Sequence, residues 1–422
     1  MVEDRNNALG IYISVPFCRS KCTYCNFASG VYPASEQAHY VERVTQDLAS
    51  AGAWAAQMGV ELPRRVDTIY LGGGTPSLLR PELMARLFAA IAAEFTVIAD
   101  AEITVECAPG QLAEDTLAAM ANSGVNRVSL GVQSFVDREA QQSGRLHTSA
   151  IVSADIERLR DAGIANINVD LIAGLAGQTL ASWQHSLDAL LALRVPHASV
   201  YMLEVDEDSR LGREMLSGGA RYHAGLVPSD ETIARMYTMA IERLAVGVPN
   251  TSGSSADGLD QYEISNFSRA GFRSRHNLRY WQRRSYLGLG LDASSMLRAT
   301  PEVSPARDAG YVLRATTTDD LAAFQKSTGW QETAWLSPAR QFEEAWFLGL
   351  RLNAGVELAA LEREFGAAAM APALRVVDRL AANDLLTVTD GRVRLTAQGQ
   401  LLSNEVFQEF LGLTPELEFT GR

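Results

Sequence analysis

Three cysteines, Cys18, Cys22 and Cys25, lie close together after an apolar run and a proline, with the spacing C-x3-C-x2-C. Thiolates grouped in this way bind zinc, copper or an iron–sulfur cluster. A structural zinc site needs a fourth cysteine or histidine nearby, but position 27 is Phe and the next histidine is His39. Three thiolates on a four-iron cluster leave one iron open, as in metal sites that bind substrate. Three buried cysteines or an incomplete zinc knuckle are the alternatives.

The motif is part of a longer pattern, Y-x-S-V-P-F-C-x3-C-x-Y-C-x-F, over residues 12–27. This pattern resembles the radical S-adenosylmethionine (SAM) enzymes, and within them the branch that holds oxygen-independent coproporphyrinogen III oxidase and the HemW-type haem chaperones. The resemblance covers nearly the whole chain and is closest to the chaperones. It implies a [4Fe–4S] cluster on Cys18, Cys22 and Cys25, whose open iron chelates the amino and carboxylate groups of SAM.

A glycine run, Gly-Gly-Gly-Thr-Pro at 72–76, follows the second apolar run. Glycines let a backbone approach a ligand closely, although by itself such a run is equally consistent with a tight turn. The segment resembles the family's GGxTP segment, which holds the SAM amino group, and this implies SAM contacts for Gly73, Gly74 and Thr75.

Further SAM contacts are implied at the ends of later apolar runs. Glu106 matches a SAM-contacting carboxylate, although Ala108 stands where the family has Asn or Asp. We expect Cys107 to be a core residue, because neighbours on a strand face opposite ways. Polar residues inside apolar strand ends are costly unless they bind something; turn capping or a buried ion pair is the alternative. The family match assigns the remaining SAM or second-ligand positions to Gln133, Arg145 and Asp170, and places Tyr12 and Tyr24 near SAM.

Residues 269–284 contain six arginines, and no acid occurs between Glu263 and Asp292. One interpretation is a solvated surface loop. The other is a site for a flat anionic ligand, in which arginines bind propionates and aromatic rings stack. An H-N-x-x-Y-W motif resembling the chaperone branch favours haem, with His276 as an iron ligand. The haem-binding candidates are His276, Asn277, Tyr280, Trp281, Arg275 and Arg279.

Short apolar runs alternate with helical patterns in the first half of the chain, which predicts an α/β fold with a parallel sheet. The expected strands are 11–15, 66–71, 102–106, 127–131, 164–171 and 198–203, and the expected helices are 35–58, 81–95, 113–123, 150–162 and 180–193. Six such units make a partial (β/α)6 barrel, the fold that the resemblance implies. The motifs then lie at the carboxyl ends of strands, where such barrels carry their chemistry.

We expect three parts: a radical SAM barrel over 1–246, a crossover segment with a flexible loop and the H-N-x-x-Y-W region over 247–334, and a C-terminal domain over 335–422. The last part is predicted to hold helices from Ser337-Pro338, at 357–364, 370–382 and 397–410, and a hairpin at 385–395. This order indicates a small winged-helix-like α+β domain. Its 8 basic and 12 acidic residues give a charge of 8 − 12 = −4, which argues against DNA binding.

The chain has 422 residues and a formal net charge of −13, which argues against a nucleic-acid partner. No apolar run approaches the length of a membrane span, and the polar N-terminus does not read as a signal peptide. Four cysteines, three of them in one motif, do not form a disulfide framework. We expect a cytoplasmic protein, which the resemblance also allows at the inner face of the membrane. A dimer is one option for its oligomeric state.

Two functions remain. The first is a haem chaperone that passes haem to target haem proteins, including membrane-bound respiratory ones. The second is a radical SAM oxidoreductase acting in porphyrin biosynthesis, as in the decarboxylation of coproporphyrinogen III, or another haem-modifying reaction. The decarboxylase has a fourth cysteine where this chain has Phe27, and a longer N-terminal extension, so the chaperone is favoured. Asp292 and Ser294 also replace the Gly and His of a family segment. Whether SAM is cleaved stays open.

Overall fold

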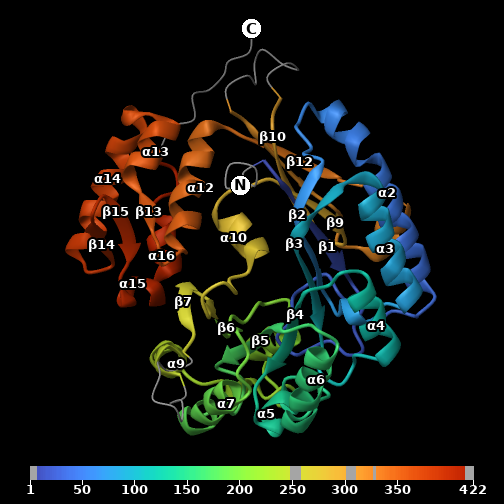
Figure 1. Cartoon of the computed structure of the whole chain (residues 1–422). Coiled ribbons are helices and arrows are strands. Elements are labelled where there is room, and N and C mark those ends of the chain that lie inside the picture. Colours follow the sequence, from blue (N-terminus) through green and yellow to red (C-terminus); the bar gives the residue numbers. More distant parts are fainter. Residues whose placement is uncertain (1–6, 248–257, 301–309, 327–328, 414–422) are drawn as a thin grey trace.

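The computed structural model describes residues 7–247, 258–300, 310–326 and 329–413. Its centre is one sheet with the strand order β12-β11-β10-β9-β1-β2-β3-β4-β5-β6-β8-β7 (Figure 1). Six parallel strands form the middle: β1 (Leu9–Val15), β2 (Arg65–Gly73), β3 (Thr96–Cys107), β4 (Arg127–Gln133), β5 (Asn166–Ala173) and β6 (His197–Met202). The six predicted strands are thus confirmed, and the curved sheet is a partial barrel with two edges.

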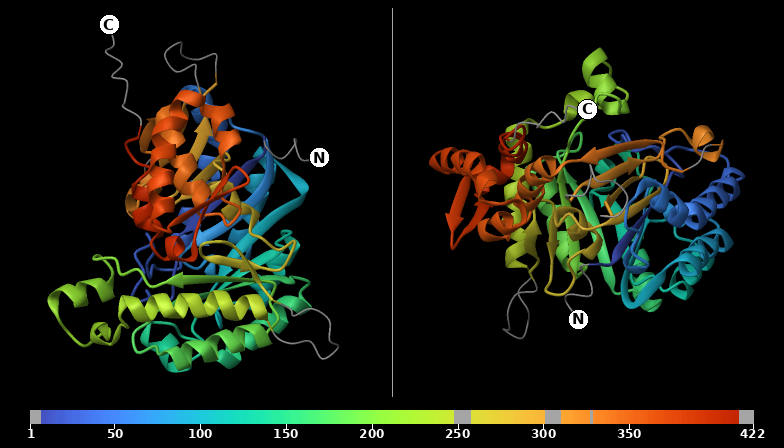
Figure 2. Two further views of the ribbon diagram at one scale, coloured as in Figure 1. Left: turned by 90° about the vertical axis from the view of Figure 1, so that its left-hand side faces the viewer. Right: turned by 90° about the horizontal axis from the view of Figure 1, so that it is seen from above.

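Helices cover the outer face of these strands (Figure 2). They are α2 (Glu36–Met58), α3 (Pro81–Glu94), α4 (Glu114–Asn122), α6 (Ser149–Asp161), α7 (Leu180–Ala192) and α9 (Asp230–Val246), with short elements η1 (Pro76–Leu78), α5 (Asp137–Gln142), α8 (Arg210–Ser217) and η2 (Ala224–Leu226). Local sequence sets several boundaries. The side chains of Thr148, Thr179 and Ser229 accept the first free amides of α6, α7 and α9. Gly59 ends α2 with φ of 68°.

The segment after α9 adds strands to both ends of the sheet. It contains β7 (Asp260–Glu263), β8 (Asn266–Ser268), α10 (Arg275–Trp281), β9 (Tyr286–Gly290), β10 (Ser294–Arg298), β11 (Val312–Thr316), α11 (Leu321–Lys326) and β12 (Glu332–Leu336). β8 pairs antiparallel with β6, whereas β9 pairs parallel with β1 at the other side. Residues from this segment share the main hydrophobic core with the six central strands. The predicted boundary at 247 stays a prediction, and the loop that was predicted to be flexible falls on residues 248–257, outside the described residues.

The C-terminal part has a core of its own, in which Trp346 stacks on Phe410 at 4.8 Å between ring centroids. It contains α12 (Pro338–Leu350), β13 (Val356–Glu357), α13 (Leu358–Phe365), α14 (Ala367–Ala382), β14 (Leu386–Thr389), β15 (Arg392–Leu395), α15 (Ala397–Leu401) and α16 (Ser403–Gln408). The predicted helices and hairpin are present. One detail was wrong: the expected helix 397–410 is two helices, because Leu402 leaves the helical region with φ −109° and ψ 30°.

Candidate functional site

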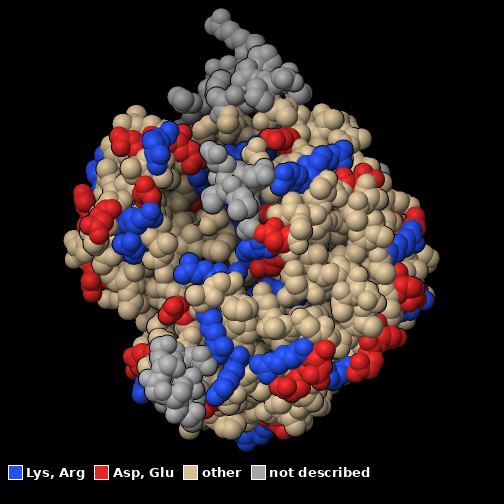
Figure 3. All heavy atoms as spheres, in the orientation of Figure 1, with Lys and Arg blue, Asp and Glu red and all other residues tan. Residues whose placement is uncertain are grey.

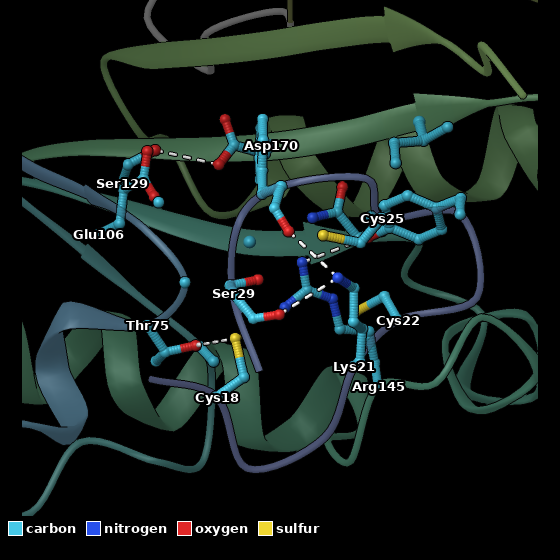
Figure 4. Close-up of a pocket in the computed structure, with 18 of the residues that line it drawn as sticks. Cys18, Lys21, Cys22, Cys25, Ser29, Thr75, Glu106, Ser129, Arg145 and Asp170 are labelled. Carbon is cyan, nitrogen blue, oxygen red and sulfur yellow. Dashed lines mark hydrogen bonds between the residues drawn. The ribbon is translucent and has the colours of Figure 1, made fainter. Parts of the chain in front are cut away.

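A cavity of about 520 Å³ opens at the carboxyl ends of the parallel strands. It is lined by the three motif cysteines and by polar side chains from β2 to β6. Figure 4 shows the cysteine-bearing loop facing Glu106 and Asp170 across this space. The structure therefore brings together residues that the sequence separates by up to 152 positions, from Cys18 to Asp170.

The loop after β1 carries Cys18, Cys22 and Cys25, and all three thiols are free and half-buried. Its base is closed by the Cys18 amide, which donates to the Gly30 carbonyl at 2.9 Å. Lys21 Nζ, a contact that the sequence did not suggest, donates to the carbonyls of Phe27 and Ser29, each at 3.1 Å. The Lys21 ammonium group thus holds the backbone of the loop together. Because this contact does not involve the thiols, they remain free to face the cavity.

Gly74 explains why the glycine run must follow β2. A Cβ atom at this position would lie 2.8 Å from the Phe17 carbonyl oxygen and 3.0 Å from Cys18 Sγ. The Gly74 and Thr75 amides donate to the carbonyls of Val15 and Phe17, each at 2.8 Å. The run therefore fixes the cysteine loop against β2 as well as leaving backbone open to a ligand.

Glu106 lies at the end of β3, where Tyr70 donates to its Oε1 at 2.8 Å. Burial raises the pKa of Glu106 to about 7; the Tyr70 hydrogen bond opposes this rise and the charge of Asp170 adds to it. The carboxyl group therefore changes its charge near neutral pH, and a cationic group placed beside it would favour the ionised form.

Asp170, on β5, accepts hydrogen bonds from Ser129 Oγ at 3.0 Å and from Asn168 Nδ2 at 2.7 Å. Burial raises its pKa, and hydrogen bonds from Ser199, Asn168 and Ser129 counteract the rise. The donors hold the carboxylate in one orientation toward the cavity.

Gln133 ends β4 at a β-bulge and has φ of 71°, in the left-handed region that a non-glycine residue rarely adopts. Its Oε1 is buried without a hydrogen-bond partner among the described residues. Arg145 Nη2 lies 3.3 Å from the Tyr24 hydroxyl oxygen, and both residues line the cavity. A strained backbone that presents an unpaired amide oxygen is consistent with a ligand contact at Gln133.

Tyr12 is the predicted SAM residue that does not line the cavity. Its ring packs 6.1 Å from that of Tyr70 and 6.3 Å from that of His276, measured between centroids. Cys107 is buried on β3, as predicted.

Known proteins with this architecture are found both among protein families and among solved structures. The radical SAM superfamily matches residues 12–190, and the HemN C-terminal domain matches residues 336–402. The haem chaperone HemW of Bacillus subtilis is 34% identical over 402 residues, which cover 95% of this chain and 98% of that protein. HemW of Lactococcus lactis is 32% identical over 413 residues, covering 97% and 98%. The chain belongs to the HemW family of radical SAM proteins.

The fold of this HemW family member is also found in a solved structure, the radical SAM enzyme coproporphyrinogen III oxidase (HemN) from Escherichia coli. The two share a TM-score of 0.77 and 21% sequence identity, over 96% of this chain and 90% of that one. This likeness confirms the radical SAM fold.

The radical SAM superfamily uses a [4Fe–4S] cluster and SAM, and the residues present fit both groups. Three half-buried thiols face the cavity, Gly74 leaves room beside Cys18 Sγ, and Gln133 presents an unpaired oxygen. Among the described residues, no three His, Cys, Asp or Glu side chains converge as a single-ion site requires. Cys18, Cys22 and Cys25 would hold the cluster, which would supply an iron position for binding SAM.

We expect Glu106→Ala to weaken SAM binding by roughly 1.5–3 kcal/mol at pH 8, because the change removes a charge-assisted hydrogen bond. At pH 6 most of the wild-type carboxyl is protonated, given its pKa of about 7, so the difference between variant and wild type should shrink. Calorimetry at both pH values measures this. Glu204→Ala is the matched control, since Glu204 also lines the cavity. Equal SAM affinity of Glu106→Ala and wild type at pH 8 would remove Glu106 from the site.

Three of the six arginines of residues 269–284 form ion pairs with acids that are far away in sequence. Arg279 is fully buried and pairs with Asp67 on β2, and Arg284 reaches the same carboxylate at 3.0 Å. Arg283 pairs with Glu364 of the C-terminal part at 2.7 Å. Although the segment itself contains no acids, part of its positive charge is therefore neutralised by acids from other parts of the chain. In Figure 3, Lys and Arg are interspersed with Asp and Glu over the face shown.

His276 lies on α10 and is 1% exposed. Its Nδ1 lies 3.0 Å from Thr68 Oγ1 and its Nε2 lies 2.8 Å from the Tyr280 hydroxyl. The Glu102 carboxylate accepts the backbone amides of Arg275 and His276, each at 3.0 Å, and so fixes the start of the helix. The predicted axial-ligand role of His276 stays a prediction, and in this structure the ring nitrogen that binds iron must first lose its hydrogen bond to Thr68 or to Tyr280.

The other haem-binding candidates have different surroundings. Arg351 lies over the Trp281 ring, 4.3 Å from its centroid, and Tyr280 packs edge-on against Tyr286 at 4.7 Å. The Arg275 guanidinium donates to the Asp100 carbonyl. Asn277 differs from the rest, because it lines the cavity.

Sequence reasoning missed an inner row of polar residues. Arg127 and Ser129 on β4 line the same cavity as the predicted SAM residues, as do Asn168 on β5 and Ser199 on β6. The signal was available, because each residue is an even number of positions from a polar or aromatic residue at the end of its own strand, which places both on one strand face. Arg127 and Ser129 precede Gln133 by six and four positions, and Asn168 and Ser199 precede Asp170 and Tyr201 by two.

Proposed function

We propose that this protein is a haem chaperone that binds haem and delivers it to haem proteins. The observation that carries the proposal is the similarity to HemW proteins over nearly the full length of the chain. Two further observations support it. The cysteine loop has Phe27, 61% exposed, where the decarboxylase has its fourth cysteine, and the residues suited to the cluster and to SAM are retained around one cavity.

Recipients of the haem are proposed to include respiratory haem proteins, some of them in the membrane. Within the described part of the chain, no helix combines the length and the apolar character needed to cross a bilayer. A cytoplasmic protein that visits the inner face of the membrane would meet such recipients, and we propose this location.

The test uses anaerobically prepared protein with its cluster. Titration with haem should give saturable binding and a Soret band distinct from that of free haem, and the loaded protein should transfer haem to membranes from haem-depleted cells. The same preparation, given reductant, SAM and coproporphyrinogen III, should leave the porphyrinogen unchanged. Decarboxylation of coproporphyrinogen III, or failure to bind haem, would favour the oxidoreductase instead.

The predicted iron ligand has its own test. If His276 is the axial ligand, His276→Ala should shift the Soret band of the haem complex and lower haem affinity. Tyr280→Phe is the matched control, because it removes only the hydroxyl that contacts Nε2. A folded His276→Ala protein with the wild-type Soret band and affinity would rule out this ligand.

A further inference from the structure

The inner end of the cavity contains a buried arginine that neither the cluster nor SAM accounts for. Arg127 begins β4 and is 1% exposed. It lines the cavity on the same strand face as Ser129, Gly131 and Gln133, at the end of that row away from Gln133. The row thus runs inward from a predicted SAM contact to a guanidinium.

Arg127 makes no ion pair with another residue of the described structure. Its Nε is buried without a hydrogen-bond partner, and no described carboxylate lies within ion-pairing distance of the guanidinium. Arg279 makes the contrast clear, since it is equally buried but pairs with Asp67 and donates to two backbone carbonyls. Burying a charge without an ion-pair partner costs folding free energy. The interactions inside the protein therefore do not explain why Arg127 is charged and buried, whereas an anionic ligand would.

One carboxylate, that of Asp170, acts on Arg127 through its charge, at more than ion-pair distance. The Thr104 hydroxyl, on the residue that pairs with Arg127 across β3 and β4, is itself buried without a partner. Burial, with the charge of Arg127 adding to it, lowers the pKa of His197 well below its usual range, so this imidazole is neutral. Asp170 is influenced by Arg127, but its two oxygens accept from Ser129 and Asn168.

Asn277 of α10 lines the same cavity and directly follows His276, whose pKa the charge of Arg127 helps to lower. The Asn277 side chain makes no hydrogen bond to another described residue. A guanidinium and a primary amide that both face one space are donors suited to a carboxylate, which accepts several hydrogen bonds at once.

We propose that the inner end of the cavity binds a carboxylate group of a ligand through Arg127 and Asn277. The site is separate from the iron position, where the SAM carboxylate belongs, and it does not require that the protein carry haem. A carboxylate of this kind comes either from a haem propionate or from a free small carboxylic acid. Arg127 rather than a lysine suits the role, because its planar fork stays charged when buried and matches a carboxylate.

The first experiment measures thermal unfolding of the cluster-loaded protein in sodium propionate or succinate, with chloride as the reference anion at equal ionic strength. A ligand that binds only the folded state raises the melting temperature. We expect this rise in wild type and its loss in Arg127→Gln and Asn277→Ala. Without carboxylate, Arg127→Gln should melt no lower than wild type, because the charge that it removes is buried and makes no ion pair. Arg86→Gln, on the surface, is the control that should respond as wild type does.

The second experiment separates the two sources. Haem and its dimethyl ester are titrated into wild type and Arg127→Gln. If a propionate occupies the site, Arg127→Gln weakens haem binding about tenfold or more and leaves binding of the ester unchanged. Unchanged haem binding together with a lost response to free carboxylate identifies a free acid as the ligand. If Arg127→Gln responds to carboxylates as wild type does and binds haem equally well, the carboxylate site is overturned, while the haem-carrier function stands.

Discussion

Replacing Cys18, Cys22 and Cys25 together by alanine is expected to remove all bound iron and acid-labile sulfide, along with the brown colour of the anaerobically prepared protein. The three thiols are the free cysteines of the loop that faces the cavity. The backbone of this loop is held by Lys21 and by β2 through hydrogen bonds that do not involve the thiols. The variant should therefore fold and lose only the cluster, which iron and sulfide analysis and circular dichroism together would show.

Cys107→Ala provides the matched control for the triple variant. Burial raises the pKa of the Cys107 thiol to about 12, so it stays protonated at neutral pH, whereas a cluster ligand must be a thiolate. We expect the control to retain full iron and sulfide. Stoichiometric zinc without sulfide in wild type, or a cluster that persists in the triple variant, would contradict the assignment.

Arg279→Met should lower the free energy of unfolding by about 3–5 kcal/mol, because it leaves the buried Asp67 carboxylate short of one of its partners. Asp67 is 2% exposed, and the lost guanidinium also donates to the carbonyls of Ala8 and Ser285 at 2.9 and 2.7 Å. Denaturant unfolding followed by circular dichroism measures the change. Arg86→Met breaks a surface pair with Glu42 and should cost at most about 1 kcal/mol.

This measurement also distinguishes a structural role of Arg279 from a role in ligand binding. A strongly destabilised Arg279→Met protein assigns this arginine to the fold, and the double variant Asp67→Leu with Arg279→Met should recover part of the loss. If Arg279→Met instead has the same free energy of unfolding as wild type and binds haem more weakly, Arg279 would remain a candidate for ligand binding.

Most of the parallel sheet could be predicted, because a strand that is buried within a parallel sheet appears in the sequence as a short apolar run, which can be recognised without knowledge of its neighbours. The run at 127–131, for instance, becomes β4 with two further residues. Gln133 could be placed at a strand end, but its left-handed conformation depends on a bulge against β5 that local sequence does not record. Motif spacing likewise identified the cysteines, whereas the contact of Lys21 with the carbonyls of Phe27 and Ser29, just after the last cysteine, required the folded loop.

Local sequence could not show the partners of the basic segment, because three of its six arginines pair with acids that the fold brings in. Asp67 pairs with Arg279 from 212 positions away, and Glu102 holds the start of α10 from 174 positions away. A window of sequence shows six arginines without acids, and only the tertiary structure shows their partners. The same limitation hid Arg127, which looks like an ordinary strand-start residue until its lack of a partner is seen.

The pairing of β9 with β1 has a consequence for biosynthesis. β1, which carries the cysteine loop, has β2 on one side and residues 286–290 on the other. Because the ribosome releases the N-terminus first, β1 keeps one open edge until the chain has grown past Gly290. We therefore expect β1 to be protected only late in synthesis. Ribosome-bound chains halted before β9 emerges should leave residues 9–15 open to protease, and chains halted well beyond it should protect them; equal protection in both would show that β1 is secured without β9.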